Sequence, residues 1–168
     1  KPYQFLTESY AFPNSSELDP SLVYFFTIPL LYGMIVGDVI YGLISIALAL
    51  FFIKKFKGSA IMSSISRLWL FSAIPAILFG LVFDEFAGMT HYHLLEKLEA
   101  WGLFHLESLG MTGPLYLGIS RLHNLTTVFQ ITLIVGMIHL ALGLVMGAIN
   151  EWHHSKKHAI GKLAWIGV

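Results

Sequence analysis

Three long stretches of the sequence are almost entirely apolar. They cover residues 22–53, 68–83 and 125–149, and the only Asp, Glu, Lys or Arg inside them is Asp38. A helix that crosses a bilayer needs about 20 apolar residues, with a range of about 17–25. As one helix, the first stretch would be about 48 Å long at a rise of about 1.5 Å per residue, whereas the hydrocarbon core is about 30 Å thick. We therefore expect this stretch to break into two helices.

The most suitable place for the break is Gly37-Asp38. The segment from Gly33 to Gly42 contains three glycines and one carboxylate, a composition typical of a turn. We predict a tight hairpin at this point. Four spans are then expected in total, at about 21–37, 39–55, 66–86 and 126–149.

The predicted fold class is all-α, a polytopic transmembrane helix bundle of about four spans with a short amphipathic helical outer loop. In chain order we expect the end of a cytoplasmic linker (1–20), a first transmembrane hairpin (21–55), a cytoplasmic linker (56–65), a third span (66–86), an outer loop with interfacial helices (87–125), a fourth span (126–149), and a cytoplasmic loop with the start of a further span (150–168).

The distribution of charge predicts the orientation. Residues 54–67 contain four basic side chains and no acid, so the positive-inside rule places them in the cytoplasm. Residues 84–124 contain five acids against Lys97 and Arg121, so this connection is expected on the outer side. Residues 1–20 carry three acids and one lysine, which argues mildly against the cytoplasmic position that the hairpin gives them.

The outer connection has a helical pattern of its own. Leu94, Leu95 and Leu98 begin a series of apolar residues at near-helical spacing with charges between them. This pattern predicts one or two short amphipathic helices, which we expect to break around Gly110 and at Gly113-Pro114.

Composition excludes several classes of protein. Of the 168 residues, 56% are hydrophobic and 12% charged, whereas a soluble domain has roughly 25% charged residues. Ten basic and ten acidic residues cancel, so the chain has no basic field for a nucleic-acid partner. Cysteine is absent, which excludes disulfides, thiolate metal sites and a cysteine nucleophile. We expect an integral membrane protein in contact with lipid. Because a new apolar run starts just before Val168, we also expect a longer polypeptide.

Asp38 is the most informative residue. A carboxylate at the membrane centre costs about 2.5–3.5 kcal/mol on insertion scales, and such residues often serve proton or ion paths. Alternatively, Asp38 lies at the interface and caps the second helix by accepting backbone N–H bonds. Asp84 and Glu85 end the next span on the same outer side. They either attract protons together with Asp38 or mark the end of a helix, and both interpretations stay open.

His139 lies deep inside the last apolar stretch. A neutral imidazole there can relay protons or hydrogen-bond a neighbouring helix, and we favour the second role. We also expect glycines to let helices approach closely. The candidates for helix packing are Gly33, Gly37, Gly42, Gly80, Gly136, Gly143 and Gly147.

The other histidines indicate solvated surface. Glu151, His154 and His158 could share one helical face, but they lie in a polar tail, and His91 and His93 flank a tyrosine in the outer loop. The sequence has no Walker loop, no nucleophile elbow and no His-Glu-x-x-His motif. We therefore expect no catalytic residue, no metal and no cofactor.

Three ordered motifs between about residues 17 and 150 carry a family resemblance. They are Glu17-Leu18-Asp19-Pro20 followed by Gly37-Asp38-Val39-x-Tyr41-Gly42, then Phe79-Gly80-x-x-Phe83-x-Glu85-Phe86-x-Gly88, then Gly136-x-x-His139-x-x-x-Gly143 leading to Asn150. Together they resemble the membrane domain of the large stator subunit of rotary ATPases. That subunit is called subunit a in the eukaryotic V-type enzyme and subunit I in the archaeal and bacterial A/V-type.

The resemblance implies the N-terminal half of that membrane domain. In the family this domain lies beside a ring of proteolipid subunits, and two half-channels carry protons to and from a ring carboxylate. By motif position, Asp38 and Glu85 match acidic positions near the outer half-channel, whereas Asp84 falls where the family often has Gly or Asn. The family's ring-facing arginine belongs to later spans, so this chain alone is expected not to pump.

The implied partners are the proteolipid c-ring, the peripheral stalk and the soluble ATPase head. The resemblance thus implies a non-catalytic, ion-translocating subunit of a multi-pass kind, in the plasma membrane if prokaryotic and in an endomembrane if eukaryotic. Two other functions remain open. One is a fragment of a secondary transporter with a glycine-broken helix at its binding site. The other is a structural membrane anchor, in which Asp38, Glu85 and His139 are packing or boundary residues.

Overall fold

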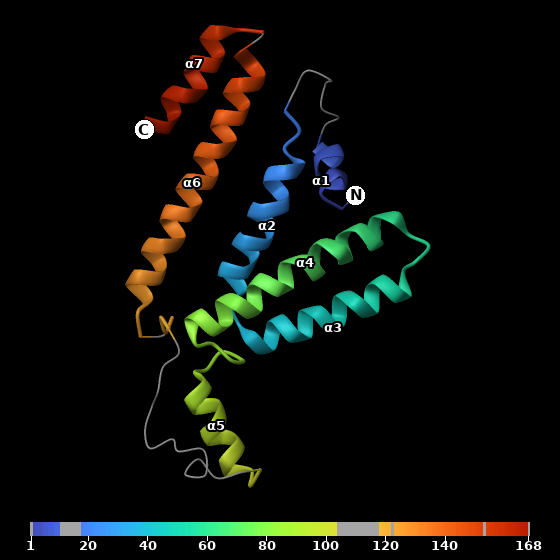
Figure 1. Ribbon diagram of the computed structural model, residues 1–168, viewed down its shortest axis with the longest axis vertical. Coiled ribbons are helices and arrows are strands. Elements are labelled where there is room, and N and C mark those ends of the chain that lie inside the picture. The colour runs from blue at the N-terminus through green and yellow to red at the C-terminus, as the bar shows by residue number, and fades with distance from the viewer. Residues whose placement is uncertain (1, 11–17, 104–117, 122, 153, 168) are drawn as a thin grey trace. The chain divides into compact units, whose positions relative to one another are not determined.

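The computed structural model describes residues 2–10, 18–103, 118–121, 123–152 and 154–167. The chain divides into two compact units, one made of residues 1–27 and 129–168 and the other of residues 28–128. The described residues form α-helices, which confirms the predicted all-α class (Figure 1). The helices are α1 (Pro2–Tyr10), α2 (Ser21–Val36), α3 (Val39–Lys55), α4 (Ala60–Phe83), α5 (His91–Ala100), α6 (Leu125–Trp152) and α7 (Lys156–Ala164), followed by a short 3-10 helix (Trp165–Gly167).

Two of the described helices, α4 and α6, are long and apolar enough to cross a membrane by length and composition. Helix α2 is apolar but has only 16 residues, and α3 has 17. The number of four spans therefore stays a prediction. Helix α2 ends at Val36 and α3 begins at Val39, so the chain does break at Gly37-Asp38. The break was expected there because the first apolar stretch is too long for one span.

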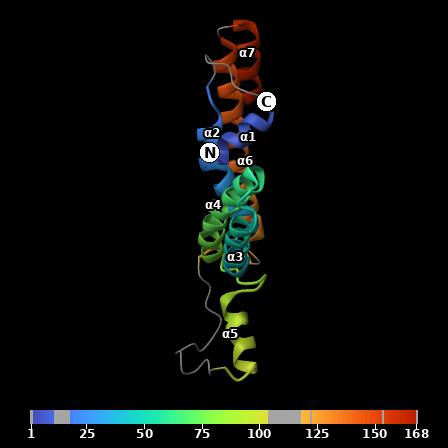
Figure 2. The ribbon, with the colours of Figure 1, turned by 90° about the vertical axis from the view of Figure 1, so that its right-hand side faces the viewer.

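In the unit of residues 28–128, α3 and α4 form an antiparallel pair and lie side by side in both views (Figures 1 and 2). The pair is close because small residues face each other. A Cβ added to Gly42 would lie 2.5 Å from Cγ1 of Ile77, and Ala49, Ala73 and Ala76 are fully buried. Such contacts suit a lipid environment, where helices associate through van der Waals packing of small residues.

The described antiparallel pair consists of α3 and α4. The hairpin of the first two apolar helices, expected from the sequence at 21–55, stays a prediction. The antiparallel connection lies at residues 56–59, where Ser59 caps α4 by accepting a hydrogen bond from the Met62 N–H at 3.3 Å. The end of α2 packs on α4 as well, since a Cβ on Gly33 would lie 2.6 Å from that of Pro75.

The connection after α4 contains one of the expected amphipathic helices. Leu94, Leu95 and Leu98 lie in α5, which Thr90 caps by accepting from the His93 N–H. The expected breaks at Gly110 and Gly113-Pro114 fall outside the described residues.

The other unit contains two short helices that the sequence analysis did not specify, α1 and α7. On α1, the Tyr3 ring packs edge-on against Phe25 with centroids 5.2 Å apart, and the hydroxyls of Thr7 and Ser21 lie 2.7 Å apart. Helix α7 runs back along α6 (Figure 1). An ion pair joins the two helices, with the Lys162 ammonium 3.2 Å from a carboxylate oxygen of Glu151.

Candidate functional site

The start of α3 and the loop after α4 meet at Asp38, which is 1% exposed. One carboxylate oxygen, Oδ1, accepts the Tyr41 N–H at 3.0 Å and so caps α3. The other, Oδ2, accepts the Gly88 N–H at 2.8 Å. Asp38 is therefore both a helix cap and a link between two segments that lie 50 residues apart in sequence.

Backbone contacts hold the same two segments together. The Val39 N–H donates to the Glu85 carbonyl at 3.0 Å. Gly80 of α4 lies directly against the break, and a Cβ there would come within 2.7 Å of the Asp38 carbonyl carbon. Only glycine permits this approach, so Gly80 sets the position of the α3 start on α4.

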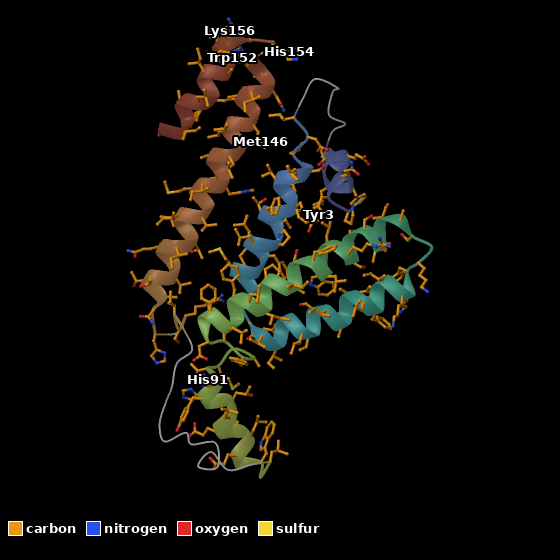
Figure 3. All side chains as sticks on the ribbon, viewed as in Figure 1. Tyr3, His91, Met146, Trp152, His154 and Lys156 are labelled. Carbon is orange, nitrogen blue, oxygen red and sulfur yellow. The ribbon has the colours of Figure 1, made fainter. Side chains whose placement is uncertain are left out.

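Asp84 ends α4 in the left-handed conformation, with φ 55°, which an aspartate tolerates better than most residues. Its side chain is 1% exposed, and Oδ1 lies 2.6 Å from Nδ1 of His91, at the start of α5 (Figure 3). The His91 N–H also donates to Oδ1, at 3.3 Å. Among the described residues Oδ2 has no hydrogen-bond partner.

Glu85 follows Asp84 and pairs with Arg121. Arg121 Nε lies 3.2 Å from Oε2 of Glu85, and the two side chains are 22% and 16% exposed. The same guanidinium donates to the carbonyl oxygens of Met34 at 3.0 Å and Ile35 at 3.4 Å, in the last turn of α2. It thereby satisfies carbonyl groups that the end of a helix leaves without a partner.

Burial and charge act on Glu85 in opposite directions. Desolvation raises the pKa of its carboxyl, which lies beyond the end of α4. The neighbouring Arg121 lowers this pKa, and the negative charge of Asp38 raises it. The result is a carboxyl that takes up a proton more easily than one in water.

His139 lies in the other unit. Its Nδ1 is buried and has no hydrogen-bond partner among the described residues. The side chain borders a groove of about 450 Å³, whose lining includes Tyr24, Gly143 and Asn150. Asn150 Oδ1 in turn accepts the Leu18 N–H at 2.8 Å. His139 and the cluster around Asp38 thus belong to different compact units of the chain.

The candidate packing glycines fall into two groups. A Cβ at Gly33, Gly37, Gly42 or Gly80 would collide with a neighbouring segment, and one at Gly147 would touch the side chain of Lys162. At Gly136 and Gly143, no described atom lies within 4 Å of the added Cβ. For these two the packing role stays a prediction.

Sequence reasoning missed two residues of the cluster. His91 was assigned to solvated surface but is 7% exposed and pairs with Asp84. Arg121 was counted only as one of the two basic residues in the connection of residues 84–124. The signal that could have found Arg121 is that it is the one arginine in a connection with five acids. Among the described residues, no group of three or more His, Asp or Glu side chains is placed to hold a metal ion.

Comparisons with known proteins identify relatives of the chain. No family model matches it. It is 30% identical over 158 residues to the A-type ATP synthase subunit I of Halobacterium salinarum, covering 94% of this chain and 20% of that protein. It is 29% identical over 157 residues to the A-type ATP synthase subunit I of Methanocaldococcus jannaschii, covering 88% of this chain and 23% of that protein. It is 28% identical over 177 residues to the same subunit of Thermococcus kodakarensis, covering 99% of this chain and 24% of that protein. The chain thus spans only about a fifth to a quarter of the length of these relatives.

Two described helices long and apolar enough to cross a membrane, taken together with these relatives, indicate a helical membrane protein. More particularly, its homologues are A-type ATP synthase subunit I proteins, so the chain fits the A/V-type ATPase subunit I family. The family resemblance of its motifs is thereby confirmed.

Proposed function

We propose that this chain forms part of the stator membrane subunit of a rotary A/V-type ATPase and contributes to the ion path beside the proteolipid ring. The observation that carries this proposal is the similarity to subunit I, which extends over 88% to 99% of the chain in the relatives described above. The chain supplies no ATP chemistry. Its partners are the proteolipid c-ring, the peripheral stalk, the soluble ATPase head and the lipid bilayer, which it crosses in several spans.

The cluster at the end of α4 supports a role in proton transfer. Asp38, Asp84 and Glu85 collect three carboxyl groups in one unit, each at least four-fifths buried. Carboxylates in low-dielectric surroundings concentrate protons from the adjacent water. Asp84 Oδ2 has no hydrogen-bond partner within the described part of the chain, and burial favours the protonated form of Glu85. We assign Glu85 and Asp38 to the outer half of the ion path, with Asp84 and His139 as further candidates.

One observation favours a second function, that of a structural anchor. Both oxygens of Asp38 accept backbone N–H bonds. A carboxylate used in this way stabilises the break between α2 and α3 without moving protons. Neither Glu85 nor Asp84 uses both carboxylate oxygens to accept backbone N–H bonds among the described residues. Substitutions at these two positions therefore distinguish an ion path from an anchor.

The test uses the native complex with Asp38→Asn and Glu85→Gln. We expect assembly to remain intact and ATP-driven proton flux into vesicles to fall by about tenfold or more, as for loss of a proton-transfer group. The matched control is Glu96→Gln, which neutralises an exposed acid on α5 and should leave flux unchanged. Wild-type flux in the double variant would contradict the ion-path role, and failure of assembly would favour the anchor.

A second experiment tests the assignment of partners. The native protein, purified in mild detergent, should carry a proteolipid ring and soluble ATPase subunits that mass spectrometry identifies. If the protein purifies without partners, or with unrelated proteins, a secondary transporter would be favoured instead.

A further inference from the structure

The segment before α6 packs its backbone on the end of α4. The Ile119 N–H donates to the Val82 carbonyl at 2.8 Å, and the Arg121 N–H donates to the Phe83 carbonyl at 3.2 Å. A Cβ on Gly118 would lie 2.5 Å from the Val82 carbonyl oxygen, so glycine is needed for this contact. The backbone therefore fixes the point from which the Arg121 side chain starts.

The guanidinium of Arg121 is held on two further sides. Its Nη atoms donate to the carbonyl oxygens of Met34 and Ile35, and Cζ lies 4.7 Å from the centre of the Phe83 ring. Arginine suits such a site because its planar group can donate several hydrogen bonds and stack on an aromatic ring at once. These contacts leave Nε facing Glu85.

The contact between Arg121 and Glu85 is one of charge. Nε and Oε2 lie 3.2 Å apart, yet neither atom has an aligned hydrogen-bond partner among the described residues. Hydrogen bonds to α2 and the contact with the Phe83 ring hold the cation in place beside Glu85. A fixed cation next to a carboxylate stabilises the ionised form of that carboxylate.

We propose that Arg121 is a positioning residue for Glu85, holding a fixed positive charge beside the carboxylate so that Glu85 returns to its ionised form after each proton passes. The inference rests on the proposed function of Glu85 in the ion path. It adds a residue that the family motifs in this sequence do not include.

Other charged or titratable groups lie on the segments that neighbour Glu85 in the fold or along the chain. Asp38 lies at the start of α3, Asp84 precedes Glu85 in the loop after α4, His91 begins α5 and pairs with Asp84, and His123 follows Arg121 along the chain. Asp38 and burial both favour the protonated form of Glu85. Arg121 opposes them, so its removal should let Glu85 stay protonated to a higher pH.

The experiment measures ATP-driven proton flux of the reconstituted native complex as a function of pH. Glu85→Gln identifies the limb of the pH profile that depends on this carboxyl. In Arg121→Gln we expect that limb to move to higher pH by about one pH unit or more. Arg121→Lys, which keeps the charge, should restore most of the wild-type profile. The matched control is Arg67→Gln, at an exposed position on α4, which should not move the profile.

The outcomes separate the inference from the function on which it rests. Unchanged flux in Glu85→Gln would contradict the proposed function itself. Slow flux in Glu85→Gln, together with an Arg121→Gln profile that is lower at every pH but not shifted, would overturn the role of Arg121 and leave it as a brace for α2.

A second measurement covers the case in which Arg121→Gln does not assemble. Infrared difference spectra between the wild-type protein and Glu85→Gln report the protonation of Glu85 directly. We expect a carboxylate band at neutral pH, whereas a protonated carbonyl band there would overturn the inference.

Discussion

Helices α4 and α6 are both long and apolar, but their surroundings differ. In the most apolar part of each helix, 33% of α4 is buried against 6% of α6. Gly80 of α4 lies against the backbone of the chain break, whereas Gly136 of α6 has no described neighbour near its Cα hydrogens. Apolar composition decides that a helix can enter a membrane. Contact of small residues with a neighbouring backbone decides what the helix packs against.

Polar groups show the same contrast. At the end of α4, Asp38 has both oxygens bonded and Glu85 has a fixed counter-charge. On α6, the Nδ1 of His139 is buried without a partner among the described residues. Both regions thus contain buried polar atoms without a hydrogen-bond partner among the described residues, but the α4 region also pairs its charges, whereas His139 on α6 has no described charged partner.

The strongest test of this contrast is Gly80→Val. The new side chain would overlap the backbone at Asp38 and Val39, which cannot move aside without breaking the α3 cap. We expect the free energy of unfolding to fall by roughly 3 kcal/mol, measured by thermal unfolding of the native protein in detergent. The control is Gly58→Val, where a Cβ meets no atom within 4 Å. Equal losses at both positions would contradict the tight packing at Gly80.

Asp38→Ala should have the next largest effect. It removes the cap of α3, worth about 0.5–2 kcal/mol, and the hydrogen bond from the Gly88 N–H, worth about 0.5–1.5 kcal/mol because Gly88 itself is exposed. Asp38→Asn retains one carbonyl oxygen and should lose about half as much stability. Ser155→Ala, which removes the cap of α7, is the control and should cost less because it breaks only one long hydrogen bond. A loss no larger than that of the control would show that the link to Gly88 is unimportant.

His139→Leu tests the other side of the contrast. Removing a buried nitrogen that has no partner in the described part of the chain should raise the free energy of unfolding by up to about 1 kcal/mol. Thermal unfolding of the native protein measures it. A clear decrease would mean that His139 hydrogen-bonds a segment beyond the described residues, in line with its predicted role in joining helices.

The smallest effect is expected for Lys162→Gln. Its ion pair with Glu151 joins α6 to α7, but the two side chains are 42% and 34% exposed. Exposed pairs contribute about 0–1 kcal/mol, so the unfolding temperature should barely change. A loss comparable to that of Asp38→Ala would indicate that α7 is a main support of α6.

Local composition predicted the helices but not their contacts. The break at Gly37-Asp38 followed from helix length and turn residues, and α5 followed from the spacing of its leucines. The nine residues of α1 have a weaker pattern, because the helix mixes polar and apolar residues and is stabilised by contacts with Phe25 and Ser21.

The candidate site was predictable only in part, for a related reason. Asp38 and Glu85 stood out because acids are rare next to apolar stretches. Arg121 contacts Met34, 87 residues earlier in the chain, and no local pattern encodes such a distance. A glycine in an apolar helix looks the same in the sequence whether or not another segment packs on it. Gly80 lies against the backbone of another segment, whereas no described atom lies within 4 Å of a Cβ added to Gly143.

The break between α2 and α3 has an electrical consequence. A helix carries a partial positive charge at its N-terminus and a partial negative charge at its C-terminus, each about half an elementary charge. Interrupting a helix therefore creates two opposed partial charges within a few residues. Here the carboxylate of Asp38 sits on the positive end of α3, and the guanidinium of Arg121 sits on the negative end of α2. Each end is neutralised where it arises, so the field of the interruption falls off steeply and the two helices can end close to hydrocarbon.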